Sequence, residues 1–190
     1  FRFAGGVEAA ARSSEKRIVV RPPSGSSVGA FELTIEAGEF RETVRGVVVG
    51  AAWTVTVFPW TAEVDPREKL EAWRALAAGP GAVTVEAGAI DFAFGGRGPG
   101  AVWKGDADRL SWRDRFGVIA RTTLDLPAGA WRFRTLSDDG VRVRVGGSGG
   151  KTVIENWTWH GPMRDEGVYQ SEGGPVEVEV EYFEIDGHAV

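Results

Sequence analysis

Short runs of β-branched and aromatic residues, separated by glycine and proline, recur along this chain and constrain its fold more than any other feature. Val176–Phe183 (VEVEVEYF) alternates apolar and acidic or aromatic residues, and Ala30–Glu36 (AFELTIE) alternates in the same way. A period of two residues is typical of a β-strand that has one buried face. We therefore expect a half-buried strand at each of these two places.

Similar runs predict further strands and, together, an all-β protein. The other expected strands are Arg17–Arg21, Thr43–Val49, Trp53–Phe58, Val83–Glu86, Ile90–Phe94, Phe116–Leu126, Trp131–Thr135, Val141–Val145, Thr152–Trp157 and Gly167–Gln170. The 190-residue chain has 27 glycines and nine prolines for turns, and 43% hydrophobic residues for a core. We expect an antiparallel β-sandwich, preceded by a loose lead-in at residues 1–16, where the sequence has no clear period.

One short helix is expected in this β-rich chain, near residues 65–78. Asp65 and Glu68 have the spacing of a capping box, in which side chains satisfy the first free N–H groups of a helix. Gly79 is followed by a proline and marks the end of the helix. Trp73 lies on the apolar face and is expected to pack in the core beneath the helix.

The glycine-rich segment 145–152 (VGGSGGKT) is similar to a phosphate-binding loop but fails two requirements of one. That loop needs a glycine five positions before the Gly-Lys-Thr end, and this position is Val145. The loop must also open a helix, whereas Thr152–Trp157 is rich in β-branched and aromatic residues. We therefore expect a hairpin turn rather than a nucleotide site.

Charge and composition exclude several classes of function. With 27 acidic and 22 basic residues the net charge is −5, which argues against nucleic acid or an anionic membrane as a partner. No apolar run approaches the roughly 18 residues of a membrane span. The absence of cysteine excludes disulfides and thiolate metal sites. The alternation with valines predicts a solvent-facing side of a strand for Glu177, Glu179 and Glu181, and not a pair of catalytic carboxylates. We therefore expect no catalytic function.

Four separated motifs occur in order in the second half of the chain. They are PAG at 127–129, SDDGVR at 137–142, VIENW at 153–157 and EYFE at 181–184. In this order they resemble the protective-antigen-type β-sandwich domain, the PA-fourteen family, closely over about residues 113–189. The upstream segments IDFAFGGRGPG and GDADRLSW resemble earlier parts of the same family more loosely.

The resemblance implies a domain at 51–190 and leaves residues 1–50 as a β-rich segment of a neighbouring module. Two features depart from the family pattern: the turn after Val145 has glycines where an Asp is common, and the last strand stops early and is expected to be truncated. Because the chain begins at Phe1, we expect a fragment of a longer protein with neighbouring domains. By family analogy its location is expected to be extracellular or periplasmic.

The adjacent Asp138 and Asp139 are the candidate metal ligands. In sugar-binding members of the resembled family such a pair holds Ca²⁺, an ion that requires several hard oxygen ligands. The alternative is a simple turn, because Asp followed by Gly favours turns in which the side chain bonds to its own backbone.

The segment NWTWH, which starts at Asn156, is the candidate for ligand contacts. Trp157 and Trp159 share a face for as long as the strand lasts, and one of them is expected in the core. If Trp159 lies beyond the strand end, its ring can stack on a sugar. Asn156 can offer its amide to Ca²⁺ or to a hydroxyl. His160 and His188 lack partners at metal-binding spacing, and His160 is expected in a loop.

Two functions remain open at this point. The first is a non-catalytic, carbohydrate-binding recognition module of an exported protein, with Ca²⁺ at the Asp pair. The second is a structural spacer or protein-interaction module that binds neither sugar nor metal. The second predicts that Trp157 and Trp159 are both buried and that Ca²⁺ has no effect.

Overall fold

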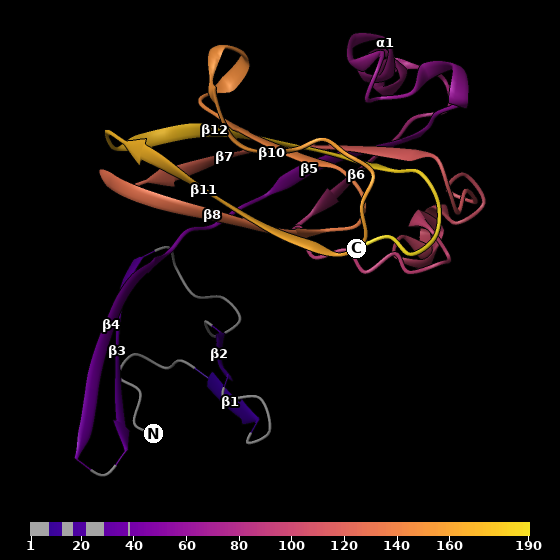
Figure 1. Cartoon of the computed structure of the whole chain (residues 1–190). Coiled ribbons are helices and arrows are strands. Elements are labelled where there is room, and N and C mark those ends of the chain that lie inside the picture. Colours follow the sequence, from indigo (N-terminus) through magenta and orange to yellow (C-terminus); the bar gives the residue numbers. More distant parts are fainter. Residues whose placement is uncertain (1–7, 13–16, 22–28, 38) are drawn as a thin grey trace. The chain divides into compact units, whose positions relative to one another are not determined.

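The computed structural model describes residues 8–12, 17–21, 29–37 and 39–190 of the chain (Figure 1). The chain divides into two compact units, Phe1–Gly50 and Ala51–Val190. Among the described residues no helix has the length and apolar character needed to cross a membrane.

The first unit contains two antiparallel strand pairs. They are β1 (Glu8–Arg12) with β2 (Arg17–Arg21), and β3 (Gly29–Ala37) with β4 (Phe40–Val48). Strand β1 lies inside residues 1–16, where a loose lead-in was expected, so that prediction is wrong for these residues. The strand forms because it pairs with β2, although its own sequence has no strand pattern. The rest of the expected lead-in and the side-chain burial expected for Ala30–Glu36 lie outside what the structure describes.

The second unit is built on a six-stranded antiparallel sheet. Its order is β10 (Lys151–Asn156), β9 (Val141–Val145), β12 (Gly174–Glu184), β7 (Phe116–Leu126), β5 (Trp53–Pro59) and β6 (Val83–Ala87). Strands β8 (Gly129–Ser137) and β11 (Met163–Ser171) form a separate antiparallel pair. The predicted all-β class is confirmed, with antiparallel pairing throughout these sheets.

The β8–β11 pair lies along one face of the six-stranded sheet (Figure 1). The core on this side is formed by Val55, Val57, Val118, Ala120 and Tyr182, with Phe94 and Leu110 from the long connection between β6 and β7. A second cluster contains Phe58, Trp60, Trp73, Ile119 and Phe183, and includes side chains from the helical segment. Alternate residues of the central strands thus serve two apolar clusters, which explains why these strands are nearly continuous in apolar residues.

The segment Ile90–Phe94 forms no strand, so that prediction is wrong. Its alternating apolar residues are used for packing instead of for a ladder. Phe94 is 3% exposed and lies edge-on to Phe116, while Phe92 contacts Trp103. The segment has the period of a strand but no neighbouring strand with which to pair.

The helix is shorter than predicted. It runs as α1 (Leu70–Ala75) and continues as a 3₁₀ turn, Leu76–Ala78, to the expected stop at Gly79. The other 3₁₀ turns of this unit are Ala62–Val64, Pro99–Ala101, Lys104–Asp106 and Gly147–Gly149. The Asp65 carboxylate accepts the N–H of Arg67 at 2.9 Å and pairs with its guanidinium, so a tight turn replaces the first helical turn. Trp73 is 0% exposed, which confirms its predicted place in the core.

Glu181 is not on a solvent-facing surface, contrary to its sequence interpretation. It is 1% exposed and accepts hydrogen bonds from Arg74 of α1 at 2.5 and 2.9 Å and from Arg142 of β9 at 3.3 Å. The alternation did place it opposite the valines, but α1 covers this end of the sheet. A buried carboxylate between two guanidiniums therefore ties the helix to the sheet.

The glycine-rich segment forms the predicted hairpin turn between β9 and β10. Gly146 and Gly147 have φ values of 102° and 74°, a region that residues with a Cβ rarely adopt. A Cβ at Gly147 would also approach the Glu177 carboxylate to 2.5 Å. The glycines thus serve the backbone of a turn.

Candidate functional site

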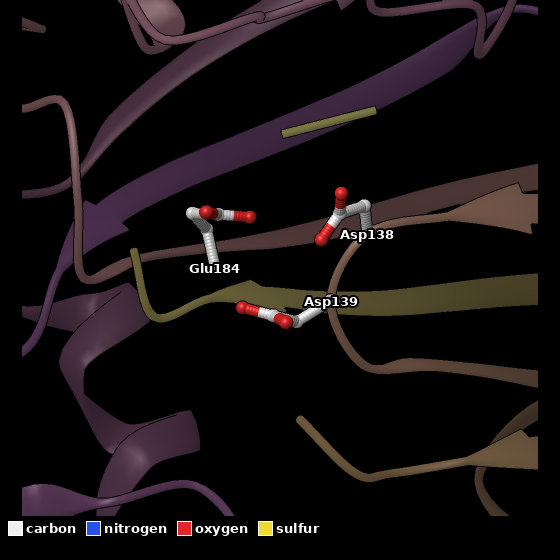
Figure 2. A group of neighbouring side chains, drawn as sticks. All are labelled: Asp138, Asp139 and Glu184. Atoms are coloured by element: carbon white, nitrogen blue, oxygen red, sulfur yellow. The ribbon is translucent and has the colours of Figure 1, made fainter. Parts of the chain in front are cut away.

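Three carboxylates meet at one end of the second unit. Asp138 and Asp139 lie in the turn between β8 and β9 and are joined by a cis peptide bond, while Glu184 is the last residue of β12. Strands β9 and β12 are paired, with Tyr182 opposite Val141, and this register brings Glu184 beside the turn. One oxygen from each carboxylate lies within 4.8 Å of the others, and Figure 2 shows the three side chains converging.

All three carboxylates are buried. Asp138, Asp139 and Glu184 are 8%, 1% and 0% exposed. The Asp139 oxygens accept the backbone N–H groups of His160 at 3.1 Å and Ile185 at 2.8 Å. These donors are far away in sequence, so Asp139 does not form the self-bonded turn considered as the alternative. Instead it joins the loop after β10 to the segment after β12.

The Tyr182 hydroxyl connects the other two acids. It bonds to the Asp138 carbonyl and lies 2.8 Å from Oε2 of Glu184, whereas Oε1 of Glu184 is buried without a partner. A hydroxyl has a single proton, so it can donate to only one of these two acceptors. If the Tyr182 hydroxyl donates its proton to the Asp138 backbone carbonyl, a hydrogen bond between Tyr182 and Glu184 requires that the Glu184 carboxyl group is protonated and acts as the donor.

Burial raises the pKa of all three carboxyl groups. For Glu184 burial is the largest cause, the charges of Asp139, Asp138 and Asp114 add to it, and the pKa rises to about 8. The pKa values of Asp138 and Asp139 are also raised, chiefly by burial. Three acids that resist ionisation together would be stabilised in their charged form by a divalent cation, and Ca²⁺ prefers such oxygen ligands.

The raised pKa of Glu184 predicts that stability depends on pH when no metal ion is present. The folded protein keeps this proton up to about pH 8, whereas an unfolded glutamate loses it near its ordinary value of 4.5. Between these values the folded state binds more protons, so the free energy of unfolding should fall as the pH rises from 4.5 to 8. Urea unfolding in chelator across this range measures the effect, and Glu184→Gln should flatten the curve. An equally steep curve in the variant would assign the pH dependence to other groups.

The predicted ligand residues Asn156 and Trp157 are occupied by contacts within the fold. The Asn156 amide donates to Asp165 at 3.0 Å, and its oxygen accepts the Thr158 hydroxyl at 2.8 Å. Trp157 is half-buried, packs edge-on against Trp73 and Phe183, and donates its indole N–H to a backbone carbonyl. Both residues therefore shape the loop that follows β10.

Trp159 lies beyond the end of β10 and is 61% exposed. The next residue, His160, is in the expected loop, and its backbone N–H is bonded to Asp139. The exposed Trp159 indole therefore belongs to the residue directly before the one whose backbone bonds to the carboxylate cluster.

Sequence reasoning assigned no role to Glu184, Tyr182 or the His160 backbone. The EYFE motif already contained a usable signal, because a period of two puts Tyr182 and Glu184 on the same side of a strand. The motif does not show that this strand pairs with β9, and this pairing places both residues beside Asp138.

Comparison with known proteins supports the resemblance that the four motifs suggested. Residues 102–189 match the PA14 domain model. A solved structure described as a PA14 sugar-binding domain from an RTX adhesin is 27% identical, with a TM-score of 0.50, and the match covers 75% of this chain and 86% of that one. The GH31 α-xylosidase (Xac1773) from Xanthomonas citri matches with 11% identity and a TM-score of 0.45, over 98% of this chain and 24% of that one. A search of curated sequences found no match. The resemblance expected from the four motifs is confirmed: residues 102–189 match the PA14 domain model, and a solved PA14 domain has a similar structure.

Proposed function

We propose that this chain is a non-catalytic module that binds carbohydrate with the help of Ca²⁺ at Asp138, Asp139 and Glu184. One observation carries the proposal: an exposed tryptophan, Trp159, lies next to the residue whose backbone bonds to the carboxylate cluster. The flat face of an indole suits the C–H face of a sugar ring. The sugar-binding description of the adhesin domain supports the same function.

The carboxylate cluster fits a calcium ion. It supplies three hard oxygens, and the unpartnered Oε1 of Glu184 is a buried acceptor for which a cation would provide a partner. Backbone carbonyls, water or sugar hydroxyls would supply the remaining ligands, since Ca²⁺ takes six to eight. Asp138, Asp139 and Glu184 would hold the ion, which would balance their charge and offer coordination to sugar hydroxyls, while the Trp159 indole would contribute apolar contact.

The second candidate is a spacer or protein-interaction module without metal or sugar. The two backbone bonds to Asp139 favour it, because they already satisfy this carboxylate. The 61% exposure of Trp159 argues against it, because this candidate predicts that Trp159 is buried. For the location, similarity to a domain from an adhesin supports an extracellular or surface protein.

Trp159→Ala tests the sugar-binding proposal. The variant is expected to bind glycans at least about tenfold more weakly, the loss expected for an aromatic stacking contact together with its buried apolar area. Because Trp159 is largely exposed, its melting temperature should stay close to that of the wild type. A glycan array in Ca²⁺ identifies the ligand, and calorimetry then compares the affinities with Ca²⁺ and with chelator.

Val168→Ala provides the matched control. Val168 is 48% exposed on β11, and its replacement removes exposed apolar surface elsewhere on the same unit. Its affinity should equal that of the wild type. If no glycan binds the wild type in either condition, the spacer module becomes the better proposal. Equal binding by Trp159→Ala would move the sugar site away from this loop.

A further inference from the structure

A cavity of about 360 Å³ lies between the six-stranded sheet and the β8–β11 pair. Its walls are mainly apolar and come from strands β5, β7, β8, β9 and β12, from the connection between β6 and β7, and from Val190. They include Val118, Ala120, Phe133, Val143, Val178 and Val180. A volume of this size lies within the range of small-molecule sites, about 300–1,000 Å³, whereas protein interiors contain few voids larger than a water molecule.

Two hydroxyl groups make one part of this cavity polar. Thr135 and Ser137 alternate with Phe133 along β8, so all three side chains project from the same face of that strand. The hydroxyl oxygens of Thr135 and Ser137 are buried without a hydrogen-bond partner, and Ser137 is only 2% exposed. Buried hydroxyls nearly always have a partner in folded proteins, so these two point to a missing polar group inside the cavity.

Partly exposed apolar side chains also line the cavity. Ile90 and Leu136 contribute to its walls and are 38% and 47% exposed. Asp91 and Arg134 are the charged residues among the lining groups, and Arg134 is paired with Glu166 at 2.8 Å. A ligand can therefore enter beside an apolar rim without passing an unpaired cation.

We propose that this cavity binds a small neutral amphiphile, an unbranched alkyl chain with a terminal hydroxyl or amide. The chain would occupy the valine-lined part, and the head group would exchange hydrogen bonds with Thr135 and Ser137. Because one liquid water molecule takes about 30 Å³, the cavity has the volume of about a dozen waters. Eight to ten carbons with one polar head fill this space.

The surroundings of the polar part select a neutral head over an acidic one. Ser137 directly precedes Asp138, and Tyr182, which also lines the cavity, is bonded to Glu184. A carboxylate beside the two hydroxyls would bring a fourth acid close to this cluster. The cavity itself uses none of the three carboxylates, so the inference holds whether or not Ca²⁺ or sugar binds.

The test is a titration of the full 190-residue chain with 1-octanol in chelator, followed by nuclear magnetic resonance of the valine methyl groups. Saturable shifts are expected for Val143 and Val178, which line the cavity, together with a rise in melting temperature. Octanoate at the same concentrations should produce neither change. Shifts that do not saturate, or equal binding of octanoate, would overturn the proposal.

Two variants locate the ligand. Ala120→Leu fills the cavity wall and should abolish octanol binding. Thr135→Val keeps the shape of the side chain and should weaken octanol about fivefold, the usual contribution of one hydrogen bond. Thr123→Val makes the same change at an exposed position of β7 and should leave the affinity unchanged. If Ala120→Leu does not fold, the comparison of Thr135→Val with Thr123→Val decides: equal affinities in these two variants would refute the assigned head-group contact.

Discussion

Asp138→Asn is expected to abolish the stabilisation by Ca²⁺ while leaving the metal-free protein at least as stable as the wild type. In the described part of the chain the Asp138 carboxylate accepts no hydrogen bond, and its pKa is raised by burial, so its charged form is unfavourable without a cation. An amide of the same shape removes that charge and leaves a neutral oxygen, a much weaker Ca²⁺ ligand, in place of one of the three carboxylates. An ion at a hundredfold excess over its Kd raises the free energy of unfolding by about 2.7 kcal/mol, and the variant should lose this increment.

Urea unfolding in Ca²⁺ and in chelator measures both parts of this expectation. Asp125→Asn is the control, because Asp125 is an exposed carboxylate on β7. It should keep the full response to Ca²⁺. If the wild type unfolds identically in both conditions, the three acids do not form a calcium site at that concentration. An undiminished Ca²⁺ response in Asp138→Asn would place the ion elsewhere.

Trp73→Ala is expected to cause the largest loss of stability, about 3 kcal/mol, the low end of the range for removing a buried tryptophan. Trp73 is 0% exposed, and its ring centroid lies 5.0 Å from Phe58 and 5.3 Å from Trp157. The low end applies because the Trp73 indole N–H is buried without a partner, so its removal also relieves a cost. Equilibrium urea unfolding of the wild type and the variant measures the difference.

Trp159→Ala is the matched control for the same substitution at an exposed position. It should change the free energy of unfolding by no more than about 0.5 kcal/mol. The pair thus separates two tryptophans that the sequence alone does not distinguish, one essential for the fold and the other available to a ligand. Equal losses in both variants would mean that Trp159 is packed, contrary to its 61% exposure.

The strands of the second unit were predictable because their signal is local. Phe116–Leu126 and Val141–Val145 have the predicted bounds, since β-branched runs between turn residues need no knowledge of the rest of the fold. Ile90–Phe94 has a similar pattern, yet it packs as a loop because no strand lies beside it. Whether a strand-like run becomes a strand therefore depends on a partner, which a local pattern does not contain.

The predicted short helix is present, but the start of the helix and the environment of Glu181 were wrong for related reasons. Asp65 and Glu68 have the spacing of a capping box, but the Asp65 side chain is taken by Arg67 two residues later. Glu181 alternates with valines as a solvent-facing residue would, but Arg74 of α1 covers it. In both cases one side-chain contact overrode the structure that the local pattern predicted.

The sequence alone determined the all-β class, the glycine hairpin and the core position of Trp73, and its resemblance to a known family pointed to Asp138 and Asp139. These depend on periodicity, on turn chemistry and on motifs that are continuous in the chain. The tertiary structure alone brought in Glu184, which lies 45 positions beyond Asp139 and reaches it through the pairing of β9 with β12. The burial of the unpartnered Thr135 and Ser137 hydroxyls could likewise be seen only in the folded structure, because it depends on the packing of the β8–β11 pair against the six-stranded sheet.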